Sequence, residues 1–267
     1  EQPGKGMALA TPFAVEVSSD DSLLFATAAG SDKLFTVDPD SGEVLDRIPT
    51  GAAPRGIALQ NNSNGAADTA WVFNALANTV SIVDVSDPKD LSIAGFVKLD
   101  DPTEHRVKQG RIWFNDADAS TTGTFSCASC HPDGHTDQLL WVLKTPVVTG
   151  GNQIMPRSTM PIRGLRDTAP FHWDGIPGDP YGGINSASVR RRVEANSDPN
   201  DPASPARHLI DGGLASTMHL EGKELINDEG KSGLLTAAER DEMAEFLINV
   251  PYPPAQKRPY TNKVTDR

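Results

Sequence analysis

An internal repeat in the first hundred residues limits the folds open to this chain more than any other feature. A first unit of short alternating segments begins with PFAVEVS (12–18) and closes with EVLDRIPTG (43–51). A second unit begins with PRGIALQ (54–60) and closes with LSIAGFVKL (91–99). Short strands that are separated by turn residues, at a period of about 40–45 residues, predict β-propeller blades.

The sequence of the repeat resembles that of YVTN-type β-propeller proteins over about residues 11–100. The matching phrase is SSDDSLLFATAAGSDKLFTVDPDSGEVLDRIPTGAAPRGIAL, followed by a weaker second copy. Two blades cannot close a ring, because propellers typically have about 4–8 blades. We therefore expect a partial propeller that an upstream segment or other chains complete. A compact β-sandwich made from the two units is the alternative.

A change of periodicity near Asp101 and Pro102 predicts a domain boundary, with blades in residues 1–101 and a second domain in residues 102–267. The run EHRVKQGRIWFND (104–116) predicts a helix. Residues 145–207 are expected to be mostly irregular, and 197–205 to form an exposed loop. The fold class is therefore α+β and multidomain, with a mainly α, cytochrome c-like domain after the blades.

The clearest helix is predicted near the end of the chain, in TAAERDEMAEFLINV (236–250). Thr236 and Glu239 form a capping box pattern, and apolar residues follow at helical spacing. Pro251 ends this helix. Met243 lies on its apolar face, where core packing explains a methionine better than metal ligation does.

The two cysteines of the chain, Cys127 and Cys130, are followed directly by His131 in the run CASCH. Thiols at this spacing can meet both vinyl groups of a haem, and the adjacent imidazole can bind the iron. A zinc site would need four ligands, usually from a second Cys/His pair, and the sequence has none. A thioredoxin-type disulfide would need a βαβ context, which is also absent. The run therefore predicts one covalently attached haem c.

The second axial ligand of such an iron is expected to be a methionine or another histidine, or the position is open and holds water. Met7 lies in the β-region and Met243 in the apolar face of a helix, which disfavours both. Several candidates are left: Met155, Met160, Met218, His135, His172, His208 and His219.

Residues 107–250 resemble the haem domains of the bacterial di-haem cytochrome c peroxidase family. The runs that match are GRIWFNDADASTTGTFSCASCHPDG, MPIRGLRDTAPFHWDG and the final helix. In that family a methionine ligand follows the phrase similar to TAPFHWDG and precedes the last helix. The resemblance thus implies that Met218 binds the iron opposite His131. The interval from His172 to Met218 is longer here than in the family, because an extra loop (176–207) intervenes.

Three arginines, Arg157, Arg163 and Arg166, precede the PFHWDG run. The resemblance and the charge imply that one of them, with Arg163 as our candidate, pairs with a haem propionate, since arginine binds carboxylates in a bidentate way. Solvated surface arginines are the alternative. His172 is a candidate for proton transfer at an open haem, or else a structural histidine. Trp141 and Trp173 are expected to line the haem pocket or to pack in the core.

Three functions fit these features. The single haem motif favours a cytochrome that transfers electrons to or from a redox partner protein, because members of the resembled family normally carry two haems. A peroxidase-like or oxidase-like haem enzyme is the alternative, so the sequence leaves enzymatic activity open. In the third possibility the blades bind a partner and the haem is structural.

The charge and hydropathy of the chain exclude some partners. A net charge of −12 argues against nucleic acid, which clustered Lys and Arg bind. No apolar run approaches the roughly 20 residues of a membrane helix, so no membrane span is expected. Because haem c is attached on the outer side of the energy-transducing membrane in bacteria, a periplasmic or otherwise extracytoplasmic location is predicted.

Overall fold

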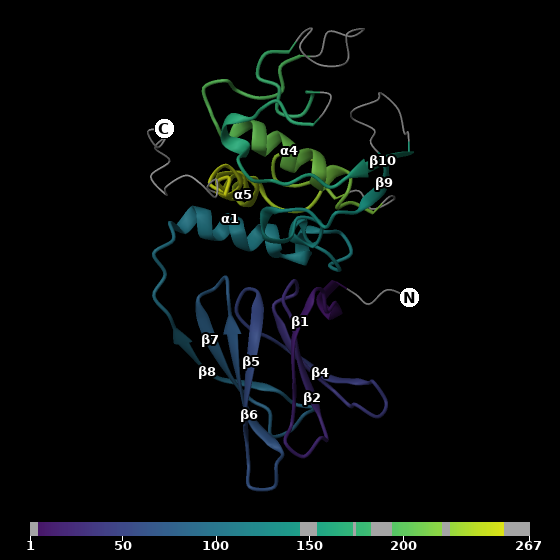
Figure 1. Ribbon diagram of the computed structural model, residues 1–267, viewed down its shortest axis with the longest axis vertical. Helices are drawn as coiled ribbons and strands as arrows, with labels where there is room; N and C mark the ends of the chain where they lie inside the picture. The colour runs from purple at the N-terminus through teal and green to yellow at the C-terminus, as the bar shows by residue number, and fades with distance from the viewer. Residues whose placement is uncertain (1–4, 145–153, 173–174, 183–193, 221–224, 254–267) are drawn as a thin grey trace, which may run out of the picture.

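The computed structural model describes residues 5–144, 154–172, 175–182, 194–220 and 225–253. Two β-sheets form the first part of the chain, and the helices that follow gather at one end of the sheets (Figure 1). The predicted α+β class, with two propeller-like blades before a mainly helical domain, is confirmed.

Each repeat unit folds into a four-stranded antiparallel sheet whose strands follow one another in chain order. The first blade consists of β1 Pro12–Val17, β2 Leu24–Ala28, β3 Lys33–Val37 and β4 Val44–Pro49. The second blade consists of β5 Pro54–Asn61, β6 Ala67–Asn74, β7 Thr79–Asp84 and β8 Ser92–Lys98. A four-stranded sheet of this kind is the blade of a β-propeller, and two blades leave the ring open.

The turn that follows β3 shows why the sequence breaks the strands where it does. The Oδ1 atom of Asp38 accepts hydrogen bonds from the backbone N–H of Asp40 (2.9 Å) and Ser41 (3.0 Å). Gly42 has a φ of +73° and donates its N–H to the Asp38 carbonyl at 2.8 Å. A short carboxylate caps the free amides, and glycine adopts the left-handed conformation without steric cost.

The two blades pack face to face around a shared apolar core. Phe25 and Leu34 of the first blade are fully buried there against Val72 and Val83 of the second. From Ala70 to Asn74 in β6, buried side chains alternate with exposed ones, as a half-buried strand requires. The contact between the blades is therefore hydrophobic and continuous.

The second part of the chain is built mainly from helices. Its elements are α1 His105–Asn115, α2 Cys127–Cys130, α4 Ser204–Ala215, α5 Ala237–Ile248 and the hairpin of β9 Leu140–Lys144 with β10 Ile154–Ser158. Short 3-10 turns lie at Lys5–Met7, Ala117–Ala119, Pro132–Gly134 and Leu165–Asp167. None of the described helices is long and apolar enough to cross a membrane.

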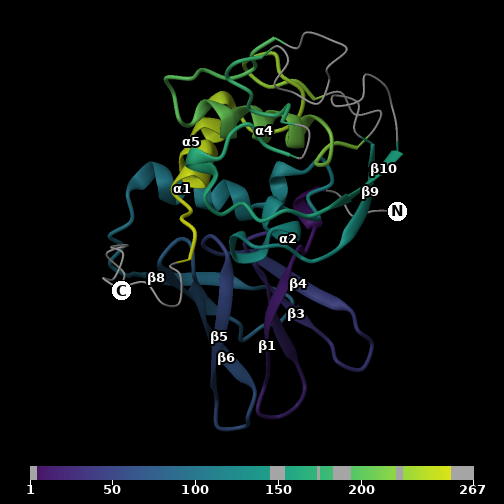
Figure 2. The same cartoon turned by 45° about the horizontal axis from the view of Figure 1, so that its top comes forward.

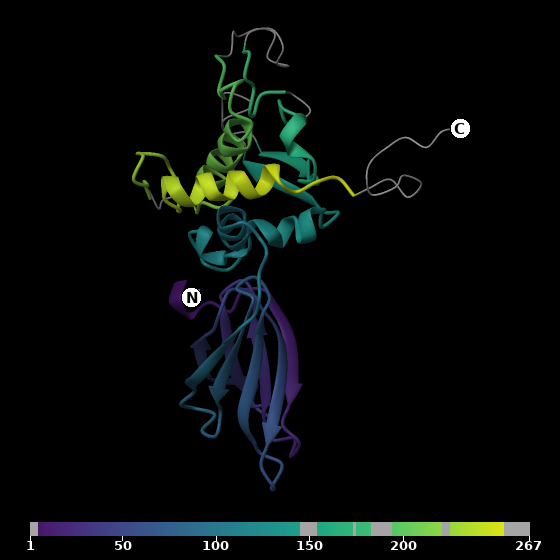
Figure 3. The ribbon, with the colours of Figure 1, turned by 90° about the vertical axis from the view of Figure 1, so that its left-hand side faces the viewer.

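Helices α1 and α5 cross in direct backbone contact (Figure 3). A Cβ atom at Gly110 of α1 would overlap the backbone carbonyl of Glu242 in α5, so the crossing requires glycine. Next to it, the indole N–H of Trp113 donates a 2.8 Å hydrogen bond to the Glu242 carboxylate. The predicted capping box of Thr236 and Glu239 is present at the start of α5.

Backbone and side-chain hydrogen bonds connect the blades to the helical part. The N–H of Ala117 donates a 2.7 Å hydrogen bond to the carbonyl of Gly30, in the loop between β2 and β3. The Nζ atom of Lys108 donates to the Ala77 carbonyl at 2.9 Å and pairs with Asp101 at 2.7 Å. The predicted domain boundary at 101/102 lies in the connection between β8 and α1 and stays a prediction.

The sequence analysis predicted neither helix α4 nor the β9–β10 hairpin; β10 and the first turn of α4 fall within residues 145–207, which were predicted to be mostly irregular. Pro205 stands in the first turn of α4, where its missing N–H costs nothing, and two glycines near the end weaken the helical pattern. Pro156 lies within β10, and proline normally disfavours a strand. Tertiary packing overrides these local preferences, because α4 buries Ala206, Ile210 and Leu214 in the core.

We expect the substitution Asp32→Asn to stabilise the protein at neutral pH. Burial raises the pKa of the Asp32 carboxyl to about 6, and the nearby Asp116 and Asp118 contribute, although the carboxylate accepts a 2.8 Å hydrogen bond from the Ala53 N–H. The folded state therefore binds the proton of the Asp32 carboxyl more tightly than the unfolded state does. The stability that the protonated carboxyl contributes below about pH 4 is lost as the pH rises through 6. At pH 7 the substitution should raise the free energy of unfolding by about 1–3 kcal/mol.

Urea unfolding at pH 4 and pH 7 measures this effect, with the exposed Asp40→Asn as the control. A lower stability of the Asp32→Asn protein at pH 7 would contradict the expectation.

Candidate functional site

The CASCH run forms the short helix α2, and its geometry follows from the local sequence (Figure 2). Ser126 and Ser129 make reciprocal capping contacts at its start, and the N–H of Ser126 donates to the Ser129 hydroxyl at 3.0 Å. The backbone N–H of His131 donates to the Cys127 carbonyl at 3.0 Å and ends the helix. Residues three apart on a helical turn lie on one side, so Cys127 and Cys130 face the same way.

The two thiols are unpaired and strongly biased toward the protonated form. Burial raises the pKa of the Cys127 thiol to about 12, and burial also raises the pKa of Cys130. A thiol of this kind is a poor nucleophile and a poor metal ligand, because both roles need the thiolate. Within the described ranges, no group of three or more His, Cys, Asp or Glu residues could hold a metal ion. Burial thus disfavours the thiolate form of both cysteines.

His131 lies half-buried beside an aromatic side chain. Its ring centroid is 6.4 Å from that of Phe114 in α1, and Phe114 in turn lies 5.5 Å from Phe246 in α5. Burial lowers the pKa of His131, while backbone groups of Met160 and His135 act in the opposite direction. Its Nδ1 atom is buried and has no hydrogen-bond partner among the described residues. Burial therefore favours the neutral imidazole, which is the form that binds metals.

The structure brings Met218 into the same apolar core against which Cys127 packs. Met218 is 6% exposed and follows the end of α4, where its N–H donates to the Gly213 carbonyl at 3.0 Å. Its own carbonyl accepts a 3.0 Å hydrogen bond from the N–H of Thr121, in the segment that leads into the haem motif. The hydroxyl of Thr121 also accepts from the Leu220 N–H at 2.8 Å. Met218 is thus held beside the segment that precedes Cys127.

Arg163 lies against the turn that follows the motif. Its Nη2 atom donates to the carbonyl of Asp133 at 2.6 Å, whereas its Nε atom is buried without a hydrogen-bond partner among the described residues. Arg166 instead donates to the Ile248 carbonyl at 3.3 Å, at the end of α5. Of these two arginines, Arg163 is the one next to the CASCH loop.

The structure places the other residues that the sequence suggested for the haem site less clearly next to the CASCH helix. His172 is exposed and has a φ of +64°, and the neighbouring Trp173 lies outside the described residues. Met160 is largely exposed, although its backbone lies near His131, and the side chain of Met155 is outside the described part. Met243 is fully buried in the core, as its position on the last helix predicted.

Asp137 organises the start of the β9–β10 hairpin directly after the motif. Its carboxylate accepts hydrogen bonds from the Leu139 N–H and from the indole N–H of Trp141, both at 2.9 Å, and its own N–H donates to the Cys130 carbonyl at 3.0 Å. Trp141 remains substantially exposed in this position. The Asp137 carboxylate therefore orients the Trp141 side chain.

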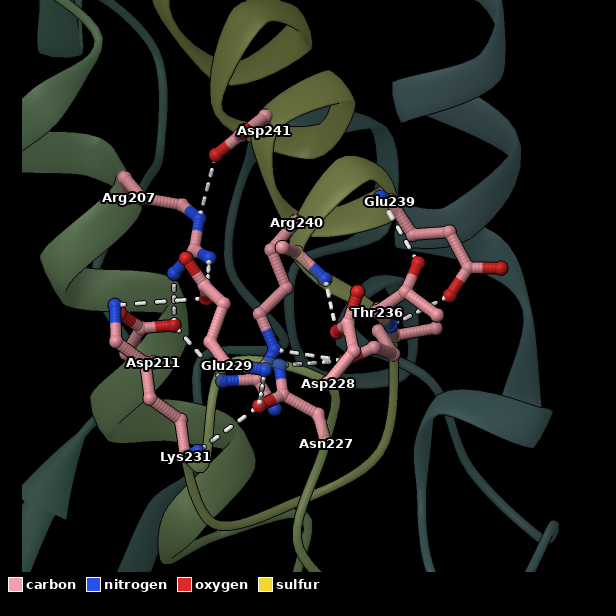
Figure 4. Close-up of polar contacts among 12 residues, drawn as sticks. Arg207, Asp211, Asn227, Asp228, Glu229, Lys231, Thr236, Glu239, Arg240 and Asp241 are labelled. Atoms are coloured by element: carbon pink, nitrogen blue, oxygen red, sulfur yellow. Dashed lines mark hydrogen bonds and ion pairs between the residues drawn. The ribbon is translucent and has the colours of Figure 1, made fainter.

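A polar network that the sequence did not predict joins α4 and α5 to the loop between them (Figure 4). Arg240 is fully buried, donates to Asp211 at 2.9 Å and also donates to the backbone carbonyls of residues 232–235. Arg207 pairs with Asp211, Glu229 and Asp241. We call this set the α4–α5 clamp; it consists of Arg207, Asp211, Glu229, Lys231, Arg240 and Asp241.

The clamp fixes both helices that border the segment containing Met218. One signal for it was present in the sequence, because Arg240 stands at a position of α5 that shares the buried stripe of Met243, Ala244 and Leu247. A charged residue on an apolar stripe is almost never fully buried unless it is paired. Its partners lie elsewhere in the chain and could not be identified from periodicity.

Part of the chain that carries this site is similar to a family of haem proteins. Residues 104–200 match the di-haem cytochrome c peroxidase family. The match includes Cys127, Cys130, His131 and Arg163, and it ends before α4 and Met218. This resemblance supports a haem-binding, cytochrome-type protein.

Over 90 residues the chain is 37% identical to the hydrazine synthase subunit gamma of Kuenenia stuttgartiensis, a stretch that covers 33% of this chain and 24% of that protein. The chain therefore spans about a quarter of the length of this curated relative.

Solved structures match about a third of the chain. The hydrazine synthase of Kuenenia stuttgartiensis has a TM-score of 0.29 at 24% identity, covering 34% of this chain and 24% of that chain. The β-propeller domain of Cps50 (Swd1) from Myceliophteria thermophila has a TM-score of 0.27 at 16% identity, covering 33% and 29%. The periplasmic gluconolactonase PpgL of Pseudomonas aeruginosa has a TM-score of 0.27 at 22% identity, covering 35% and 27%.

We expect Arg240→Met to destabilise the helical part strongly. The substitution leaves Asp211 with one donor fewer and leaves the carbonyls of residues 232–235 without their donor, so the free energy of unfolding should fall by about 3 kcal/mol or more. Chemical denaturation followed by circular dichroism measures this loss. Arg111→Met, which changes an exposed arginine of α1, is the control and should cost less than about 0.5 kcal/mol. Equal effects of the two substitutions would show that the clamp does not stabilise the fold.

Proposed function

We propose that this chain is a c-type cytochrome with one haem, which transfers electrons to or from a partner protein. Cys127 and Cys130 would hold the haem through two thioether bonds, and His131 would bind its iron. When bound, a haem supplies an iron that gains or loses one electron. The observation that carries the proposal is the motif itself, in which two unpaired thiols one helical turn apart on α2 stand directly before a half-buried imidazole.

The residues around the motif have properties that suit this role. Phe114 lies beside the His131 ring, with the two ring centroids 6.4 Å apart. Burial keeps the imidazole free of a proton, so its nitrogen lone pair is available to a metal.

Met218 is our candidate for the second axial ligand and Arg163 for the partner of a haem propionate. The thioether of Met218 is buried in the core that packs against Cys127, and a sixth ligand from the protein would exclude water from the iron. The Nε atom of Arg163 is buried without a partner among the described residues and could donate to a carboxylate.

The same proposal implies the charge of the redox partner and the compartment of the protein. An acidic chain with a net charge of −12 favours association with a basic redox partner, because opposite charges increase the rate of encounter. Haem c is attached outside the cytoplasm in bacteria, so we place the protein in the periplasm or another extracytoplasmic compartment.

Replacing both cysteines, in the variant Cys127→Ser/Cys130→Ser, should abolish covalent haem attachment. Serine cannot form a thioether bond, so the mass of the purified denatured chain should correspond to the polypeptide alone, whereas the wild-type chain should carry one additional haem. Mass spectrometry of acid-denatured protein measures the difference. Ser129→Ala, which changes the same helix without touching a thiol, is the control and should retain the haem. A colourless wild-type protein from cells that attach haem c would contradict the proposal.

Met218→Leu should open the second axial position, whereas Met243→Leu should not. Both methionines are buried in one core, and leucine conserves their volume, so each substitution should cost less than about 1.5 kcal/mol of stability. Absorption spectra of the oxidised protein, with and without cyanide, separate the two effects. Wild-type and Met243→Leu proteins should not bind cyanide, and Met218→Leu should bind it. An unchanged spectrum for Met218→Leu would mean that another group, such as Met160, is the ligand.

A peroxidase-like or oxidase-like enzyme is the second candidate, and the match of residues 104–200 to the di-haem cytochrome c peroxidase family favours it. His172, exposed in the same matched segment, would then be the candidate for proton transfer. The cyanide experiment also decides between the two candidates, because an iron with an open position in the wild-type protein would favour the enzyme.

A further inference from the structure

A fully buried carboxylate lies in the loop that precedes α4. Asp179 is 0% exposed, and the backbone N–H of Tyr181 donates a 2.9 Å hydrogen bond to its Oδ1 atom. The Oδ2 atom is buried and has no hydrogen-bond partner among the described residues. A buried carboxylate with a single neutral donor is unfavourable, because its charge has lost the solvation of water and has gained no cation in return.

A second unpartnered oxygen belongs to Asn196. The backbone N–H of Asn196 donates to the Asp179 carbonyl at 2.8 Å, so the two residues are neighbours in space. The Nδ2 atom of Asn196 donates to the Ile176 carbonyl at 2.7 Å, which fixes the orientation of the amide. The Oδ1 atom of the same amide is buried and has no hydrogen-bond partner among the described residues. Two neighbouring side chains therefore each present an oxygen atom that lacks a donor.

The backbone around these two residues is fixed in place. The hydroxyl of Ser197 donates to the Gly178 carbonyl at 3.0 Å, which adds a second link between the two segments. Gly178 has a φ of +70°, and a Cβ atom there would come within 2.9 Å of the Cβ of Pro205. The two segments thus pack against the first turn of α4, at the end of the molecule opposite the blades (Figure 1).

The chemistry of the two oxygens indicates what they would bind. A carboxylate oxygen and an amide oxygen are hard ligands, which Ca²⁺ accepts together with backbone carbonyls and water in a set of about 6–8. Mg²⁺ demands a nearly ideal octahedron, whereas Ca²⁺ tolerates irregular arrangements. Zinc prefers Cys and His, which neither residue provides. A calcium ion would also supply the positive charge that the Asp179 carboxylate lacks.

We propose that Asp179 and Asn196 bind a calcium ion through the Oδ2 atom of the carboxylate and the Oδ1 atom of the amide. The ion neutralises the buried carboxylate and links residues 176–182 to residues 196–198 beside the start of α4. The site lies apart from the CASCH run, and it does not depend on the proposed electron transfer.

Calorimetric titration and thermal unfolding of the full chain, after treatment with EGTA, test the site. Calcium at about 100 times its dissociation constant should raise the midpoint of wild-type unfolding by about 5–10 °C. Asp179→Asn should lose this shift, because a neutral amide cannot replace the carboxylate. In EGTA the same variant should unfold at a higher temperature than the wild type, since it removes an uncompensated buried charge. A purely structural role of Asp179 would not reverse the order of the two proteins with calcium.

Glu194→Gln is the matched control, because it removes the same charge from an exposed side chain two residues before Asn196. It should keep the wild-type response to calcium. Asn196→Ala is a second ligand variant, which keeps the test valid if Asp179→Asn does not fold, and it should weaken calcium binding at least about 10-fold.

Two results would overturn the proposal. A wild-type chain that binds no calcium would mean that a proton, rather than a metal ion, neutralises the Asp179 carboxyl. A calcium response that both Asp179→Asn and Asn196→Ala retain in full would assign the binding to other carboxylates of this acidic chain.

Discussion

The close crossing of α1 and α5 at Gly110 is the contact on which the candidate site depends. Any side chain larger than a hydrogen atom at this position would overlap the Glu242 carbonyl and separate the helices. One turn later, α1 presents Phe114, which reaches both Phe246 of α5 and the ring of His131. The backbone contact of two helices therefore sets the distance between the apolar wall and the imidazole.

Burial, more than charge pairing, determines the chemical state of the motif. The pKa of the Cys127 thiol is raised and that of His131 is lowered, because removal from water disfavours the charged form of each group. Charge pairing acts farther away, where Arg207, Asp211 and Arg240 hold α4, α5 and their connecting loop together. The site thus combines an apolar centre with a polar clamp that fixes its outer helices.

The blades and the helical part use different kinds of contact for different purposes. Within and between the blades the contacts are ladders of backbone hydrogen bonds and an apolar core. At the junction with the helices the contacts include polar ones, such as the hydrogen bond from Ala117 to Gly30 and the ion pair of Lys108 with Asp101. The blades are therefore a scaffold that ends in the helical part and exposes apolar faces at its sides.

Local patterns in the sequence determined the two blades, the α5 capping box and the spacing of Cys127, Cys130 and His131, because each of these depends on residues within a few positions of one another. Only the tertiary structure decided that Pro205 begins a helix, that Arg240 is buried and that Met218 lies beside Thr121. These features depend on partners far apart in the chain, such as Thr121 for Met218. No local period records such a contact, because it forms only when the packed core brings the two segments together.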